Sequence, residues 1–188
     1  MKHLFTVCHL TLFTGIWGMA PVSSSARAEQ AQLPAAKLSD DGVYTQPWFL
    51  DSFLDLREDI ADSASEGKQL VILWEQRGCP YCKETHMVNL RIPEVVDYIK
   101  AHFNVVQLNL WGDREVTDVD GEVTTEKKLA RKYRVQFTPT LQVCPSAVAD
   151  DNTKPGQDVE IWRLLGYWKP FHFLNSFVYV HSGGYQTE

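Results

Sequence analysis

Cysteine is scarce in this sequence, which limits the metal and haem sites that it can form. The 188 residues contain four cysteines, at Cys8, Cys79, Cys82 and Cys144. Structural zinc usually takes four ligands, often as two close pairs, and only His86 and Cys144 stand near the single pair here. A c-type haem attachment needs His directly after the second Cys, where this chain has Lys83. Haem attachment is therefore excluded, and a metal site is kept as an alternative.

Long apolar runs are absent beyond the first 28 residues, and a bilayer span takes about 20 such residues. Residues 1–28 have a basic start at Lys2, an apolar stretch over 4–20 and small residues up to Ala28. This pattern predicts a signal peptide, cleaved after Ala28, with retention as an uncleaved anchor as the alternative. We expect a protein exported to the periplasm.

Basic residues are few as well. The chain has 18 Lys and Arg against 24 Asp and Glu, and removal of residues 1–28 would leave 16 against 24, a formal charge of −8. Nucleic-acid binding depends on clustered Lys and Arg, so nucleic acid is excluded as a partner. The remaining 160 residues fit one domain with a sizeable core, and we expect a monomer.

Cys79 and Cys82 stand three positions apart, with Pro80 and Tyr81 between them, directly after the apolar run 70–74. This order predicts a strand that ends before the pair and a helix that begins at it. At a helix N-terminus the unpaired N–H groups and the helix dipole favour a thiolate, and proline fits the first helical position. We predict a thiol–disulfide exchange site in which Cys79 attacks and Cys82 resolves.

Neighbouring charges act on Cys79 in both directions. Arg77 and Lys83 favour its thiolate, whereas Glu75 and Glu84 oppose it, and the sequence does not fix the net effect. A purely structural disulfide is the alternative to exchange. It would close a very small loop and constrain the unfolded chain little.

Apolar periodicity and turn residues predict alternating helices and strands, and hence an α/β domain. Helices are expected at 48–66, 79–90, 93–103, 124–133 and 169–180, and strands at 69–74, 104–110, 137–143 and 159–165. Residues 29–47 are predicted to be an extended lead-in. The acidic stretch 112–123 is predicted to be a surface hairpin, because Asp120-Gly121 is a hairpin turn signal. The spacing of its acidic residues does not match that of a calcium-binding EF-hand loop.

Three blocks of the sequence resemble a thioredoxin-fold protein. They are Trp74 with the Cys-Pro-Tyr-Cys run, the stretch 129–141 with its Thr-Pro pair, and a strand that reaches Gly166. The run 74–83 and the long central connector resemble the periplasmic SoxW-type thioredoxins, associated with bacterial sulfur oxidation. The resemblance covers about residues 48–180. It implies a thioredoxin-like fold, a central mixed β-sheet flanked by helices, with an N-terminal helical extension and an acidic hairpin insertion.

The resemblance also implies roles for single residues. The Thr138–Pro139 bond would be cis and would lie beside the Cys pair, where the Thr138 backbone can pair with an extended substrate segment. Pro80, Tyr81 and Trp74 would contact substrate as well. A core role for Trp74 and an ordinary trans Pro139 at a strand edge are the alternatives.

One departure from the family affects proton transfer. Thioredoxins typically carry a buried Asp six residues before the first Cys, and this chain has Leu73 there. A proton leaving Cys82 then needs water or another group, such as Glu75. We expect His86 to be a solvated or half-buried helix residue. Cys144 is expected to be a small buried hydrophobe, with a regulatory thiol as the alternative.

We therefore expect a periplasmic thiol–disulfide oxidoreductase that reduces protein disulfides or sulfur-modified cysteines, with no cofactor beyond its redox-active disulfide and no metal. Its partners would be protein thiols and disulfides and a membrane electron donor of the DsbD or CcdA type. The alternatives are a Dsb-type oxidase or isomerase and a non-enzymatic metal carrier using Cys79, Cys82 and His86. The expected thioredoxin-like domain spans 48–182, followed by a tail at 183–188.

Overall fold

A four-stranded mixed sheet forms the centre of the computed structural model, which describes residues 32–149 and 151–186. The predicted signal peptide lies outside these residues. Strands β3 (Gln69–Glu75) and β4 (Phe103–Asn109) are parallel, and β7 (Thr140–Val143) and β8 (Trp162–Leu165) continue the sheet antiparallel, in the order β4-β3-β7-β8. The predicted thioredoxin-like fold is confirmed.

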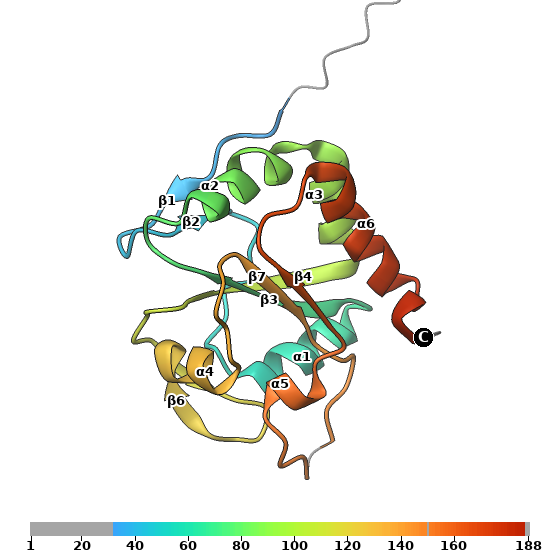
Figure 1. Ribbon diagram of the computed structural model, residues 1–188. Coiled ribbons are helices and arrows are strands. Elements are labelled where there is room, and N and C mark those ends of the chain that lie inside the picture. Colours follow the sequence, from blue (N-terminus) through green and yellow to red (C-terminus); the bar gives the residue numbers. More distant parts are fainter. Residues whose placement is uncertain (1–31, 150, 187–188) are drawn as a thin grey trace, which may run out of the picture.

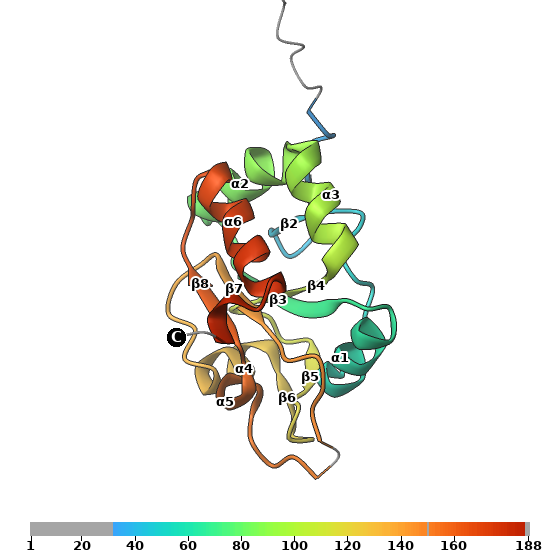
Figure 2. The same ribbon diagram turned by 90° about the vertical axis from the view of Figure 1, so that its right-hand side faces the viewer.

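Helices cover both faces of this sheet (Figures 1 and 2). One face carries α2 (Pro80–Met87), the 3-10 turn η1 (Asn89–Arg91), α3 (Pro93–His102) and α6 (Pro170–His181); the other carries α1 (Leu56–Ser65), α4 (Glu126–Lys132) and α5 (Gly156–Val159). A second 3-10 turn, η2 (Gly184–Gln186), follows α6. Across the described ranges 32–149 and 151–186, every helix is too short or too polar to span a bilayer.

Strand β3 is apolar throughout because it contributes to two cores. Side chains alternate across a strand, so Leu70, Ile72 and Trp74 enter the core under α1 and α4, while Val71 and Leu73 enter the core under α3 and α6. Glu75 continues the odd-numbered series and thereby reaches the face that α2 covers. This alternation brings a carboxyl side chain beneath α2.

The helix predicted to begin at Trp48 begins at Leu56 instead, so its predicted start is wrong. Leu54 has a φ of +64°, a left-handed conformation that cannot lie inside a helix, and Asp55 caps the helix by accepting hydrogen bonds from the N–H groups of Arg57 and Glu58. The apolar residues ahead of it are used elsewhere, since Phe49 packs on the core under α3 and α6.

A small N-terminal hairpin precedes this helix. It consists of β1 (Lys37–Leu38) paired antiparallel with β2 (Tyr44–Thr45), and residues 37–45 are called the N-terminal hairpin below. Its turn contains Gly42 at a φ of +81°. The hairpin lies beside α2 (Figure 1), and Gln107 Nε2 of β4 donates a hydrogen bond to the Tyr44 carbonyl. The predicted lead-in thus includes a folded element next to the Cys pair.

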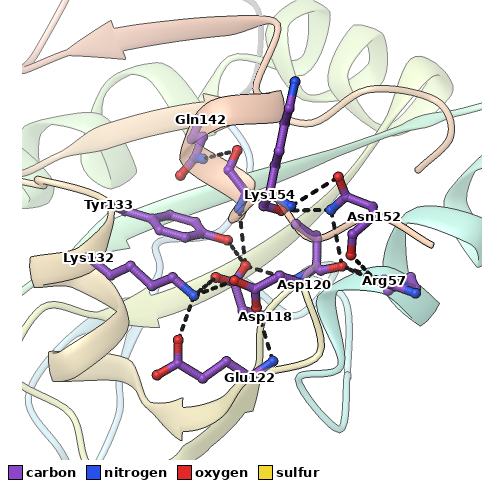
Figure 3. A network of polar contacts seen from close by, with 11 residues as sticks. Arg57, Asp118, Asp120, Glu122, Lys132, Tyr133, Gln142, Asn152 and Lys154 are labelled. Carbon is purple, nitrogen blue, oxygen red and sulfur yellow. Dashed lines mark hydrogen bonds and ion pairs between the residues drawn. The ribbon is translucent and has the colours of Figure 1, made fainter. Parts of the chain in front are cut away.

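The predicted acidic hairpin is confirmed as β5 (Glu115–Thr117) paired antiparallel with β6 (Val123–Thr125). Three of its acidic residues form ion pairs with one lysine. Lys132 Nζ lies 2.7 Å from a carboxylate oxygen of each of Asp118, Asp120 and Glu122 (Figure 3). Burial alone would lower the pKa of Lys132, but the hydrogen bonds to these carboxylates raise it above its ordinary value. The acidic stretch therefore binds a lysine of its own chain.

The same network attaches the hairpin to the body of the domain (Figure 3). The fully buried Asp118 accepts hydrogen bonds from the Tyr133 hydroxyl and, at 3.2 Å, from the Gly156 N–H. Arg57 of α1 donates through Nε to the Val119 carbonyl at 3.0 Å. The insertion is thus held by α1, α4 and α5, on the face opposite α2.

Candidate active site

Cys79 and Cys82 form a disulfide at the start of α2, with their Cα atoms 5.3 Å apart. Gly78, at a φ of +73°, turns the chain out of the sheet, and Cys79 is the N-cap of the helix. Pro80 occupies the first turn, where its missing N–H has no helical partner to lose. The predicted order of strand, Cys pair and helix is therefore present.

Two features at the Cys79 sulfur stabilise negative charge. The Cys82 N–H donates to Cys79 Sγ over 3.0 Å, and the sulfur caps an eight-residue helix whose dipole is positive at this end. Cys79 is 7% exposed and Cys82 2%, so the first sulfur is the more accessible of the two. This asymmetry suits attack at Cys79 and resolution by Cys82.

The Thr138–Pro139 peptide bond is cis, as the resemblance to thioredoxins implies. It lies against the disulfide, because Cys79 Sγ is 3.4 Å from both the carbonyl oxygen and the hydroxyl of Thr138. Phe137, which directly precedes this turn, is 58% exposed. The sequence-based prediction of site residues does not include Phe137. Its position directly before the Thr138–Pro139 pair is the pattern that could have indicated a place at the site.

The predicted substrate contacts separate into exposed and buried residues. Pro80 and Tyr81 are exposed on the first turn of α2. Trp74 is fully buried, stacks edge-on against Tyr133 and donates to Gln142 Oε1 over 3.2 Å. Its predicted place at the rim of the site is wrong, because its even position in β3 turns it toward the core on the face opposite α2.

A fully buried pair connects α2 to the sheet, with His86 on the helix and Glu75 at the end of β3. His86 Nε2 is 3.0 Å from each carboxylate oxygen of Glu75, and Gln107 Nε2 donates to the same carboxylate. His86 Nδ1 lies 3.2 Å from the amide nitrogen of Gln46. His86 was expected to be solvated or half-buried, and this expectation is wrong. In the described residues, 32–149 and 151–186, no group of three or more His, Cys, Asp or Glu is arranged to hold a metal ion.

The two cations predicted near the pair, Arg77 and Lys83, are exposed and line a cleft of about 630 Å³ together with Cys79. Arg77 Nε donates to the Asp41 carbonyl over 3.0 Å. Partial burial would raise the pKa of the Asp41 carboxyl, but hydrogen bonds from Ser39 and Asn109 hold it below its ordinary value. Asp41 is therefore ionised beside Arg77 at neutral pH.

The remaining thiol, Cys144, is 3% exposed in the core under α1 and α4. Burial, and then the negative charge of Glu160, raise its pKa above the ordinary value. A thiol in this state is unreactive, which agrees with its expected role as a small buried hydrophobe.

Comparison with known proteins agrees with this geometry. Residues 56–148 match the family model of the thioredoxin-like domain. A thioredoxin from Thermus thermophilus superimposes with a TM-score of 0.52 at 23% identity, over 72% of this chain and 91% of its own. A thioredoxin-fold protein from Helicobacter pylori gives a TM-score of 0.49 at 22% identity, over 69% of this chain and 85% of its own. No curated protein matches the sequence.

A disulfide at a helix N-terminus beside a cis proline supports thiol–disulfide exchange as the general chemistry of the site. The match to the family model begins at the first residue of α1 and ends after β7, so it contains both cysteines and the cis proline. Residues 56–148 match the thioredoxin-like family model, and the described part of the chain has the thioredoxin-like fold.

Proposed function

We propose that this protein is a periplasmic thiol–disulfide oxidoreductase that reduces protein disulfides or sulfur-modified cysteines. The observation that carries the proposal is the position of Cys79 Sγ, which caps α2 and lies 3.4 Å from Thr138. The Cys79 thiolate is stabilised at the helix end, and the exposed Tyr81 and Phe137 flank the two segments that meet at the sulfur.

The reaction proceeds by two displacements. The Cys79 thiolate attacks one sulfur of a substrate disulfide, forms a mixed disulfide and releases the other substrate sulfur as a thiolate that takes a proton. Cys82 then loses its proton and attacks Cys79 Sγ, which forms the Cys79–Cys82 disulfide and releases the second substrate sulfur. Two electrons leave the protein in each turnover.

Each turnover therefore needs a donor of two electrons, and we assign this role to a membrane protein of the DsbD or CcdA type. The export signal predicted over residues 1–28 supports the periplasmic location, and the resemblance of the run 74–83 to SoxW-type thioredoxins supports a place in sulfur oxidation. The substrate would then be a protein cysteine that carries bound sulfur.

Equilibration of the purified protein in glutathione and dithiothreitol buffers tests the proposal. A reduction potential near that of thioredoxin, about −270 mV, together with thiol-dependent reduction of insulin, is the expected result. A potential near about −120 mV would instead identify an oxidase of the Dsb type. Stoichiometric metal in the reduced protein, with no insulin reduction, would overturn the proposal in favour of a metal carrier.

A further inference from the structure

A cleft of about 630 Å³ opens beside Cys79, between α2 and the N-terminal hairpin. The hairpin contributes one wall, with Asp40 and Tyr44, and the start of α2 contributes the other, with Cys79 and Lys83. Arg77 belongs to this cleft and to a second one of about 810 Å³ that extends toward β4. The hairpin precedes the residues that match the thioredoxin-like family model, so this wall lies outside the matched region.

Arg77 lies at the boundary of the two clefts and contacts the N-terminal hairpin. Its Nε donates to the Asp41 carbonyl over 3.0 Å, which uses one of the five N–H donors of the guanidinium. The side chain lies flat on Gly42, where a Cβ would come within 2.7 Å of Arg77 Nε and 2.9 Å of its Cγ. The glycine of the hairpin turn thus makes room for the Arg77 side chain, which lines the same cleft as Cys79.

The charges that line the cleft favour an anion. Among the residues that line this cleft, Arg77 and Lys83 carry two positive charges against the single negative charge of Asp40, and the ionised Asp41 beside Arg77 lines the second cleft instead. The whole chain, by contrast, has a formal charge of −6. The overall field of the protein repels anions, so a preference for anions at Cys79 must come from this local pair. A volume of this size lies within the range of small-ligand sites, about 300–1,000 Å³.

We infer that this cleft admits a small carboxylate-bearing thiol, or its disulfide, to Cys79, with Arg77 and Lys83 binding the carboxylate. The inference rests on the proposed function, because it names a substrate class for the same sulfur. It adds a second route by which a substrate can reach Cys79. This route passes the N-terminal hairpin, whereas the first lies beside Thr138.

The exchange balances as two displacements. The thiolate of the small molecule attacks Cys79 Sγ, the disulfide breaks, and Cys82 Sγ takes the electron pair and then a proton from solvent. A second thiolate attacks the small-molecule sulfur of the mixed disulfide, which forms the small disulfide and releases Cys79 as a thiolate. Two small thiols are oxidised and one protein disulfide is reduced, and the reverse reaction follows the same path.

Reduction rates of the oxidised protein by three small thiols test the inference. The probes are 3-mercaptopropionate, 2-mercaptoethanol and 2-aminoethanethiol, which are anionic, neutral and cationic at neutral pH. Each rate is divided by the rate of the same thiol with a short peptide that contains the Cys-Pro-Tyr-Cys disulfide, because thiols differ in intrinsic nucleophilicity. We expect the corrected rate to be about tenfold higher for the anionic thiol than for the neutral one, and lowest for the cationic one.

Charge variants test whether the preference for the anionic thiol arises in the cleft. Arg77→Gln and Lys83→Gln should each reduce the ratio of anionic to neutral rates severalfold, and Asp40→Asn should increase it. Lys128→Gln is the matched control, since Lys128 is exposed on α4, across the sheet from α2, and should leave the ratio unchanged. The ratio should also fall toward one in 1 M salt, where the screening length is about 3 Å.

Equal corrected rates for the three thiols would overturn the inference while leaving the proposed function intact. A preference for the anionic thiol that persists in both Arg77→Gln and Lys83→Gln would also overturn it, because the cleft would then not be its source. Failure of every thiol to reduce the Cys79–Cys82 disulfide would instead contradict the proposed function.

Discussion

Cys79→Ser is expected to lower the rate of insulin reduction by about 10³-fold or more, to the uncatalysed level. The serine hydroxyl does not ionise near neutral pH, so the helix end and the Cys82 N–H have no nucleophile to stabilise. Cys144→Ser is the matched control, because this buried thiol has a raised pKa and takes no part in exchange. Retention of more than a tenth of the activity in Cys79→Ser would contradict the assignment of the nucleophile.

Cys82→Ser should behave differently from Cys79→Ser. The first displacement remains possible, but no second thiol can release the substrate, so the mixed disulfide at Cys79 accumulates. Non-reducing electrophoresis and mass spectrometry would detect the trapped complex and identify the substrate. The double variant Cys79→Ser/Cys82→Ser should capture nothing, which separates specific capture from chance oxidation.

Glu75→Ala is expected to lower the free energy of unfolding by about 3–5 kcal/mol. The substitution leaves His86 Nε2 buried without its partner, removes one of the two acceptors of the half-buried Gln107 Nε2 and also opens a cavity under α2. Urea unfolding followed by circular dichroism measures the effect. Glu84→Ala on the exposed side of the same helix is the control, and its effect should stay within about 0.5 kcal/mol.

The double variant Glu75→Leu/His86→Leu extends this test. Apolar replacement of both partners removes the buried donor and acceptor together, so its loss of stability should be smaller than that of Glu75→Ala. A loss below about 1 kcal/mol for Glu75→Ala would show that the buried pair contributes little to holding α2.

Local patterns were sufficient for the parts of the fold that depend on neighbouring residues. The apolar run 70–74 predicts β3, Pro80 and Pro93 predict the starts of α2 and α3, and Asp120-Gly121 predicts the acidic hairpin. Each of these signals acts within a few residues. The Cys pair was identified for the same reason, since its chemistry follows from a strand, a pair of thiols and a helix in direct succession.

The errors concern contacts between distant parts of the chain. Glu75 and His86 come from different elements, and their partner Gln46 lies 40 residues before His86, so no local pattern indicates the pair. The start of α1 was predicted too early because the apolar residues near Phe49 follow a helical pattern, although they pack against another core. No local pattern indicates that Arg77 packs on Gly42 of the N-terminal hairpin and lines a cleft with Cys79.

The proposed exchange reaction depends most directly on a stabilised thiolate at Cys79, and alkylation of the reduced protein across a pH series measures this stabilisation. Residue-resolved mass spectrometry after iodoacetamide treatment gives the rate at Cys79 apart from the rates at Cys82 and Cys144. We predict a half-maximal rate within about pH 3.5–7.5, below the value of about 8.5 for a free cysteine. A midpoint at Cys79 equal to that of a cysteine in an unstructured peptide would contradict the account.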